Sequence, residues 1–96
     1  MFMSIRKYED TGSATAIDEL AQTTLVPILK GSPGFISYSI LDLGPGSVAS
    51  VSIFETREQA LAANEATRGV VTKSFQELLP YPPTITVGEV ISHTGK

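Results

Sequence analysis

The sequence contains no cysteine, and its one histidine, His93, lies close to the C-terminal end. Without cysteine there can be no disulfide bonds, no thiolate ligands for zinc and no cysteine nucleophile. A lone histidine also leaves most metal centres and most Ser-His triads without the side chains that they need. We therefore expect no metal site, and we assign His93 to a C-terminal tail.

Charge is also scarce in this chain. Charged residues make up 18% of the sequence, against a typical value of about 25%. A net charge of -3 and a pI near 4.9 provide no basic patch for a phosphate backbone or an anionic lipid. Neither nucleic acid nor a membrane is expected as a partner, and the low charge indicates that part of the surface does not face water.

Long hydrophobic runs are missing too. No stretch approaches the roughly 18 apolar residues of a membrane span, and the first three residues, Met-Phe-Met, are followed by Ser4, Arg6 and Lys7. This pattern predicts neither a membrane helix nor a signal peptide, so the cytoplasm is the expected compartment. A chain of 96 residues holds one hydrophobic core, which predicts a single domain over residues 1–96.

Hydrophobic spacing and turn residues predict alternating strands and helices. The predicted strands cover residues 2–8, 35–43, 47–54 and 84–91, and the predicted helices cover residues 17–29 and 56–79. Pro27 predicts a kink or a second short helical turn near Thr23 and Thr24, because proline removes a helical hydrogen bond. Gly69 weakens the second helical pattern and predicts a break there.

The helix starts have recognisable caps. Ser13 or Thr15 can cap the first helix, and Thr56 with Gln59 matches a capping box for the second. Residues 92–96 are expected to form a frayed tail.

Gly44, Pro45 and Gly46 predict a tight hairpin between the second and third strands. We expect Asp42 to lie opposite Ser47 in this hairpin. One face of the hairpin would then carry the pairs Ile36 with Ile53, Tyr38 with Val51 and Ile40 with Ala49, and the other Phe35 with Phe54, Ser37 with Ser52, Ser39 with Ser50 and Leu41 with Val48.

The order βαββαβ predicts an α+β, ferredoxin-like fold with an antiparallel sheet and both helices on one face. The second face of the sheet would be uncovered. In the predicted register it shows four apolar residues around four serines: Phe35, Leu41, Val48 and Phe54. A surface with so little charge suits contact with a second copy of the chain, so a homodimer is expected.

Two motifs carry a family resemblance. Residues 33–35 are Pro-Gly-Phe where the second strand begins, and residues 52–60 are Ser-Ile-Phe-Glu-Thr-Arg-Glu-Gln-Ala where the third strand ends. With the element order, these motifs resemble the antibiotic biosynthesis monooxygenase-like proteins of the dimeric α/β-barrel superfamily. The resemblance implies two sheets facing each other across a homodimer, with a cleft between each sheet and its helices. It also implies a small aromatic or polyketide-like ligand and an oxygenase reaction without metal or flavin, so no cofactor is expected.

One branch of that family degrades haem with an asparagine, a tryptophan and a histidine. The resemblance puts Arg6 at the asparagine position, Ala63 or Asn64 at the tryptophan and Phe75 near the histidine. None of the three chemical roles is kept, so haem oxygenation is not expected.

Four residues are candidates for the implied site. Arg6 and Asn64 are the catalytic candidates: a guanidinium can hold a substrate oxyanion, and an amide can orient a substrate carbonyl. Tyr38 and Phe75 are the substrate-binding candidates, as a hydrogen-bond donor and an apolar wall.

Each candidate has a structural alternative. Arg6 can form an ion pair with Glu89, and alternation along the first strand can direct Met3 and Ile5 to the core and turn Arg6 toward the barrel. The tyrosine can bond to a backbone carbonyl, and the asparagine can simply be exposed on its helix.

The sequence supports two hypotheses of function. The first, by resemblance, is a cofactor-independent monooxygenase that orients an aromatic substrate for reaction with oxygen. The second is a non-catalytic dimer that binds a small hydrophobic molecule or serves as an interaction module. The hairpin serines have no positioned base, so cross-strand hydrogen bonds are expected of them rather than nucleophilic attack.

Overall fold

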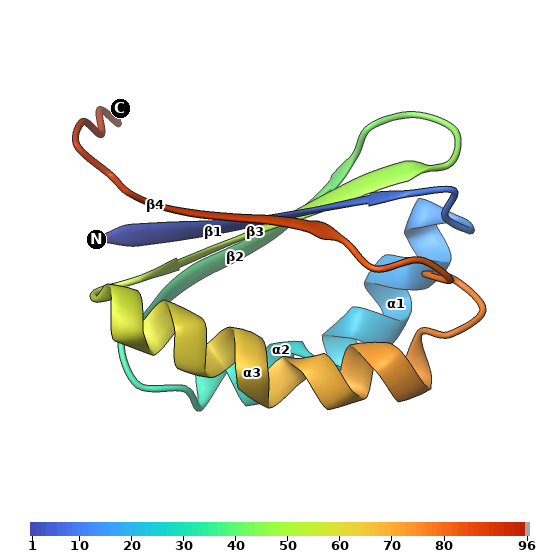
Figure 1. Cartoon of the computed structure of the whole chain (residues 1–96), viewed down its shortest axis with the longest axis horizontal. Coiled ribbons are helices and arrows are strands. Elements are labelled where there is room, and N and C mark those ends of the chain that lie inside the picture. Colours follow the sequence, from blue (N-terminus) through green and yellow to red (C-terminus); the bar gives the residue numbers. More distant parts are fainter. Residues whose placement is uncertain (96) are drawn as a thin grey trace.

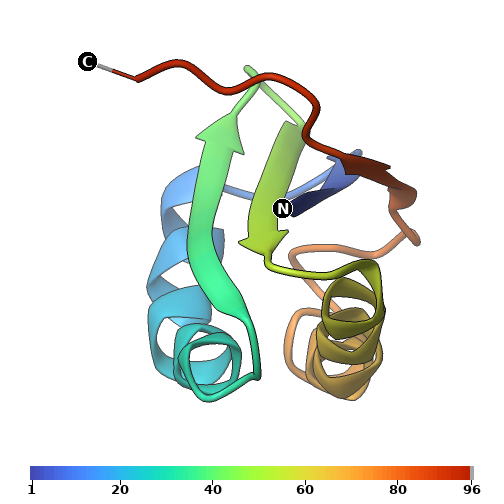
Figure 2. The same ribbon diagram turned by 90° about the vertical axis from the view of Figure 1, so that its left-hand side faces the viewer.

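The computed structural model describes residues 1–95, in which an antiparallel sheet has all of its helices on one face (Figure 1). The strands are β1 (Phe2–Glu9), β2 (Phe35–Asp42), β3 (Ser47–Phe54) and β4 (Thr84–Glu89), and the helices are α1 (Ala14–Thr24), α2 (Val26–Lys30) and α3 (Arg57–Ser74). The strand order is β2-β3-β1-β4. This arrangement confirms the predicted α+β ferredoxin-like fold. The end-on view in Figure 2 shows the α1–α2 pair and α3 side by side beneath the sheet.

The predicted helix caps and the break before Pro27 are confirmed. Ser13 Oγ accepts from Ala16 N at 3.3 Å, and Thr56 and Gln59 form both bonds of the capping box. The helical chain divides at Leu25, so Pro27 falls in the first turn of α2. A proline is tolerated there because its missing N–H would have no helical partner.

The break predicted at Gly69 is wrong, because α3 is continuous. Glycine within a helix costs only about 1 kcal/mol relative to alanine. On the opposite side of α3, Ala60, Ala63 and Thr67 are buried, and this packing outweighs the weak propensity of one residue. The helix ends sooner than predicted, with Phe75 as its C-cap, and turns follow it.

The predicted hairpin register is wrong by one residue over most of β2. Phe35 lies opposite Phe54 as predicted, but the pairing then shifts, and Tyr38 lies opposite Ser52 instead of Val51. Ile36 is the additional residue, in a β-bulge that lets two residues of β2 oppose one of β3.

The one-residue shift in pairing continues to the loop end of the hairpin, where the loop is longer than predicted. Asp42 lies opposite Val48, and its carboxylate accepts from Gly44 N at 3.0 Å. Gly44 and Gly46 have φ angles of 109° and 75°. Such values favour glycine, so these residues allow the loop that the shifted register requires.

The register decides which side chains face the helices. They are Phe2, Ser4, Arg6 and Tyr8 on β1, Val48, Ser50, Ser52 and Phe54 on β3, and Tyr38 and Ile40 on β2. The residues that alternate with these along each strand point to the open face, which is the face without helices. The apolar residues there include Met3, Ile5, Val51, Ile53 and Leu41.

Two predictions about these faces are therefore wrong. Val48 and Phe54 belong to the core under the helices, with 3% and 0% of their surface exposed, and Phe35 packs against Phe54 there, so none of the three lies on the open face. Met3 and Ile5 lie on the open face, so Arg6 turns toward the helices. Both faces carry apolar residues, and alternation alone does not tell which of two apolar faces is inside.

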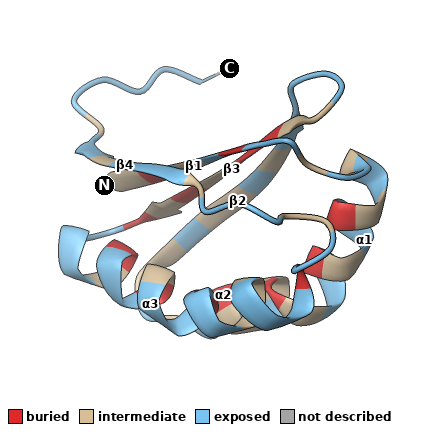
Figure 3. Ribbon diagram, turned by 45° about the vertical axis from the view of Figure 1, so that its right-hand side comes forward, coloured by how far each residue is buried: buried red, intermediate tan, exposed pale blue. Residues whose placement is uncertain are grey.

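The core forms two clusters between the sheet and the helices, and Figure 3 shows the buried segments on the facing sides of these layers. One cluster contains Tyr8, Ile17, Ala21, Leu25, Val48 and Phe75, and the other contains Leu29, Phe54, Ala60 and Ala63. No helix within residues 1–95 has both the length and the apolarity needed to cross a membrane.

The last strand ends two residues before its predicted end, at Glu89. Val90 N still donates to Met1 O at 2.9 Å. Residues 92–95, in the predicted tail, form no helix or strand, and Lys96 lies outside the described residues.

Gly34 and Gly69 make a matched pair for a stability test. Gly34 has a φ of 75°, and a Cβ there would collide with the Gln59 side chain of the capping box, whereas a Cβ at Gly69 meets nothing within 4 Å. We expect Gly34→Ala to lower the free energy of unfolding by about 1–3 kcal/mol, and Gly69→Ala to raise it by about 0.5–1 kcal/mol. Urea denaturation measures both, and a neutral Gly34→Ala would contradict this account.

Candidate functional site

A cavity lies between the inner face of the sheet and the helices. All four candidates from the sequence line it: Arg6 from β1, Tyr38 from β2, Asn64 from α3 and Phe75 just after α3. The cavity and its mouth enclose about 550 Å³, but the space open to a water-sized molecule is only about 40 Å³. As it stands, the cavity is smaller than the roughly 300–1,000 Å³ typical of pockets for drug-sized ligands.

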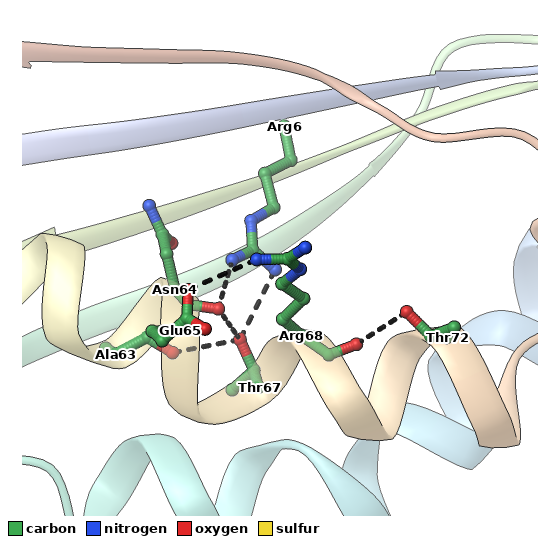
Figure 4. Close-up of polar contacts among 7 residues, drawn as sticks. All are labelled: Arg6, Ala63, Asn64, Glu65, Thr67, Arg68 and Thr72. Carbon is green, nitrogen blue, oxygen red and sulfur yellow. Dashed lines mark hydrogen bonds and ion pairs between the residues drawn. The ribbon is translucent and has the colours of Figure 1, made fainter.

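Arg6 crosses the cavity from the sheet to α3 (Figure 4). Its Nη2 donates to the backbone carbonyl of Asn64 at 3.1 Å, and its Nη1 donates to Thr67 Oγ1 at 3.3 Å. Thr67 Oγ1 in turn donates to the carbonyl of Ala63 at 3.0 Å. These bonds fix the guanidinium against one turn of the helix.

Arg6 has no acidic partner in the part of the chain that the structure describes. The ion pairs found in residues 1–95 join Lys7 to Glu9 and Arg68 to Glu65. The alternative that Arg6 pairs with Glu89 is wrong, because the β1–β4 register puts Ile85 opposite Arg6. Moreover, Arg6 Nε is buried without a hydrogen-bond partner. The site thus holds a positive charge whose bonding capacity is unfilled.

The Asn64 side chain lies against Ser4 on the sheet. Asn64 Nδ2 donates to Ser4 Oγ at 3.1 Å, and Ser4 Oγ lies 3.3 Å from Asn64 Oδ1. Ser4 is 1% exposed, and this partly buried hydrogen bond joins β1 to α3. Asn64 therefore holds the helix to the sheet with its side chain and anchors Arg6 with its carbonyl.

Two phenols, Tyr8 and Tyr38, also line the cavity. Burial raises the pKa of Tyr38 to about 12, and nearby Tyr8 adds to the rise, while the charge of Arg6 opposes it. Burial also raises the pKa of Tyr8, again against the effect of Arg6. Both phenols are therefore protonated at neutral pH and act as hydrogen-bond donors.

The cavity lining contains no aspartate, glutamate, histidine or lysine in residues 1–95. Nor does any group of three or more metal-ligating side chains occur there. Apart from Arg6 and the phenols, the polar side chains are two serines, Asn64 and Thr67, and the remaining walls are mostly apolar. Such a lining suits an apolar ring with an electron-rich oxygen.

Sequence reasoning missed Tyr8, Thr67 and Ser4. Tyr8 and Ser4 stand two residues from Arg6, and side chains two apart in a strand share a face. Thr67 lies one helical turn after Asn64, so it shares a face of α3 with it. The two-residue period of the strand and the three-to-four-residue period of the helix could therefore have identified these residues from Arg6 and Asn64.

No protein-family model matches the sequence, and no curated protein matches it either. Solved structures do match. NE2512, a protein of unknown function from Nitrosomonas europaea, is 18% identical with a TM-score of 0.78, and the match covers 99% of this chain and 93% of that one. A monooxygenase from the gene ActVA-Orf6 of Streptomyces coelicolor, solved with Nanaomycin D, is 17% identical with a TM-score of 0.78, covering 99% and 91%.

A third match is SnoaB, a cofactor-independent oxygenase from Streptomyces nogalater. It is 14% identical, with a TM-score of 0.63, and the match covers 98% of this chain and 94% of that one. The chain has the fold of the antibiotic biosynthesis monooxygenase-like proteins. This confirms, for the fold, the resemblance carried by the Pro-Gly-Phe motif and by residues 52–60.

The raised pKa of Tyr38 predicts how stability depends on pH. Because the phenol ionises near pH 10 in an unfolded chain and at about 12 in the fold, its contribution is complete below pH 10 and is lost as the pH rises to 12. The loss is at most about 2–3 kcal/mol, at about 1.4 kcal/mol per pKa unit. Urea denaturation between pH 9 and 12 should show less loss for Tyr38→Phe than for the native chain.

Tyr81, which is 60% exposed, provides the matched control. Tyr81→Phe should follow the native curve across the same pH range. Equal slopes for Tyr38→Phe and the native chain would contradict the burial of the Tyr38 hydroxyl.

Proposed function

We propose that the protein is a cofactor-independent monooxygenase that acts on a small aromatic substrate in the cavity between sheet and helices. One observation carries the proposal: Arg6, which has no acidic partner in residues 1–95 and whose buried Nε has no hydrogen-bond partner there, lines an otherwise largely apolar cavity. The fold neighbours support it, because they include a monooxygenase solved in complex with the ligand Nanaomycin D and a cofactor-independent oxygenase.

The reaction class needs no external reductant. A CH2 group that is activated by an aromatic ring and a carbonyl loses a proton to solvent water to give an enolate, and the enolate transfers electrons to O2. One oxygen atom becomes the new C=O group and the other leaves as water, so CH2 plus O2 gives C=O plus H2O. The four electrons that reduce O2 come from the substrate carbon.

The residues of the cavity would contribute binding and charge stabilisation. Arg6 holds the enolate oxygen, and fixed donors of this kind act strongly in a water-poor site. Tyr38 and Tyr8 donate hydrogen bonds to the same region, and Phe75 forms an apolar wall. Asn64 acts through its bonds to Arg6 and Ser4, as a residue that positions the guanidinium.

Removal of the Arg6 charge tests this function. Arg6→Met should lower kcat/KM by about 100-fold or more, the usual loss when a donor to a developing oxyanion is removed. Oxygen uptake above the spontaneous rate, with anthrone or the smaller oxindole as substrate, is the measurement. Arg57→Met is the matched control, because Arg57 is exposed at the start of α3 and does not line the cavity. Equal losses in the two variants would contradict the assignment.

We also propose that the active form is a homodimer joined through the open face of the sheet. That face is rich in exposed or half-buried apolar side chains, among them Met3, Ile5, Val51 and Ile53. An apolar surface of this kind favours self-association over contact with water.

Native mass spectrometry tests the homodimer with two matched variants. Ile5→Lys places a charge on the open face and should give a monomer. Leu61→Lys changes an exposed leucine on α3, which lies under the other face, and should leave a dimer. A native chain that is monomeric at every concentration would contradict the proposed assembly.

A second function is favoured by one specific observation. Because no carboxylate or histidine lines the cavity within residues 1–95, the site lacks a group to take the substrate's proton. A dimer that binds a small aromatic molecule without turning it over would have this lining. Ligand retained by the purified protein, with no oxygen uptake above the spontaneous rate, would favour this binding function.

A further inference from the structure

We propose that the cavity selects a small aromatic ligand in its ionised form, with a negative oxygen against Arg6, and that the protein itself supplies no base. This inference refines the proposed function and rests on it, because it assumes that the cavity is the substrate site. It specifies the chemical form in which the substrate binds.

The first observation is the kind of polar group that the cavity offers. Arg6 and the two tyrosines are donors at neutral pH, and the serines, Asn64 and Thr67 do not ionise there. None of the lining residues in the described chain has a carboxylate, an imidazole or an amine. The ligand must therefore arrive with an acidic hydroxyl or enol, or acquire its charge when it meets Arg6.

The elements packed around Arg6 add no base. Of the other titratable groups on β1 and β2, Tyr8 and Tyr38 line the cavity, whereas Lys7, Glu9 and Asp42 are exposed and do not. The lining residues of β3 and α3 do not titrate near neutrality. From α1, exposed Asp18 acts on Tyr38 only through its charge, as the weakest of the influences on that phenol.

The second observation is that Arg6 lacks both a counter-charge and a hydrogen-bond acceptor for its Nε in residues 1–95. A charge that is partly removed from water without a counter-charge is unfavourable. Arg6 is half-buried, it bonds to neutral oxygens of Thr67 and Asn64 and lies beside the Tyr8 phenol, and its Nε has no partner in residues 1–95. An oxyanion would provide the counter-charge and a hydrogen-bond acceptor together. Because electrostatic attraction is stronger away from water, the ionised ligand gains more from this site than the neutral one.

The size of the cavity limits the ligand. About 40 Å³ is open to a water-sized molecule, and an engineered cavity that admits benzene measures roughly 150 Å³. Even a single ring therefore requires the walls to move apart, and larger ring systems require more movement. This favours one-ring or two-ring ligands over fused polyketides.

The probe for this inference is 4-nitrophenol, a one-ring ligand that ionises near neutrality and whose phenolate absorbs visible light. With excess protein, its phenolate band should appear at a pH at least one unit lower than in buffer, which corresponds to about tenfold or greater preference for the ionised form. Arg6→Met should abolish this shift, and Arg6→Lys should keep part of it. Circular dichroism confirms that each variant is folded.

The controls separate this inference from the proposed function. Arg57→Met should keep the full shift, since Arg57 is exposed on α3 and does not line the cavity. No binding of 4-nitrophenol, an unshifted band, or an equal loss with Arg57→Met would overturn the inference. The assay involves no oxygen, so failure of turnover with an intact shift would remove only the monooxygenase proposal, and turnover with an unshifted band would remove only the inference.

Discussion

The site depends on one interaction, the contact of the Arg6 guanidinium with a turn of α3. Arg6 reaches from the middle of the sheet to the Asn64 carbonyl and the Thr67 hydroxyl, and the nearby Ser4–Asn64 contact joins the same two layers. A charge held between a sheet and its helices is energetically unfavourable unless an opposite charge pairs with it. Here its hydrogen bonds fix its position but leave the charge without a counter-ion in residues 1–95, and this is the basis of our proposal that the cavity binds a negative oxygen.

The rest of the fold supports that contact. The capping box at Thr56 fixes the start of α3, and small residues on one side of the helix, Ala60 and Ala63, are buried in the core beneath the sheet. The bulge at Ile36 turns Tyr38 and Ile40 inward, opposite Ser52 and Ser50. Without this shift, the Tyr38 phenol would point to the open face and the cavity would lose one of its donors.

Much of the fold was predictable because local signals agreed with one another. Helix caps, the break before Pro27, the hairpin glycines and the element order all follow from short-range chemistry, and the four candidate residues do line one cavity. The register and the choice of inner face were not predictable, because a bulge has no clear sequence signal and both faces of the sheet are apolar. For Gly69, packing elsewhere on α3 outweighed a small local preference.

The most direct test of the central claim follows the Nε–H group of Arg6 by ¹H–¹⁵N NMR. Within residues 1–95 this N–H has no hydrogen-bond partner from the protein. On addition of 4-nitrophenolate, the account predicts a marked downfield shift of the Arg6 Nε–H resonance, because the oxyanion completes its hydrogen bonding. Arg57 and Arg68, which are both exposed, should show no such shift. An Arg6 resonance that stays in place while ligand binds would contradict the account.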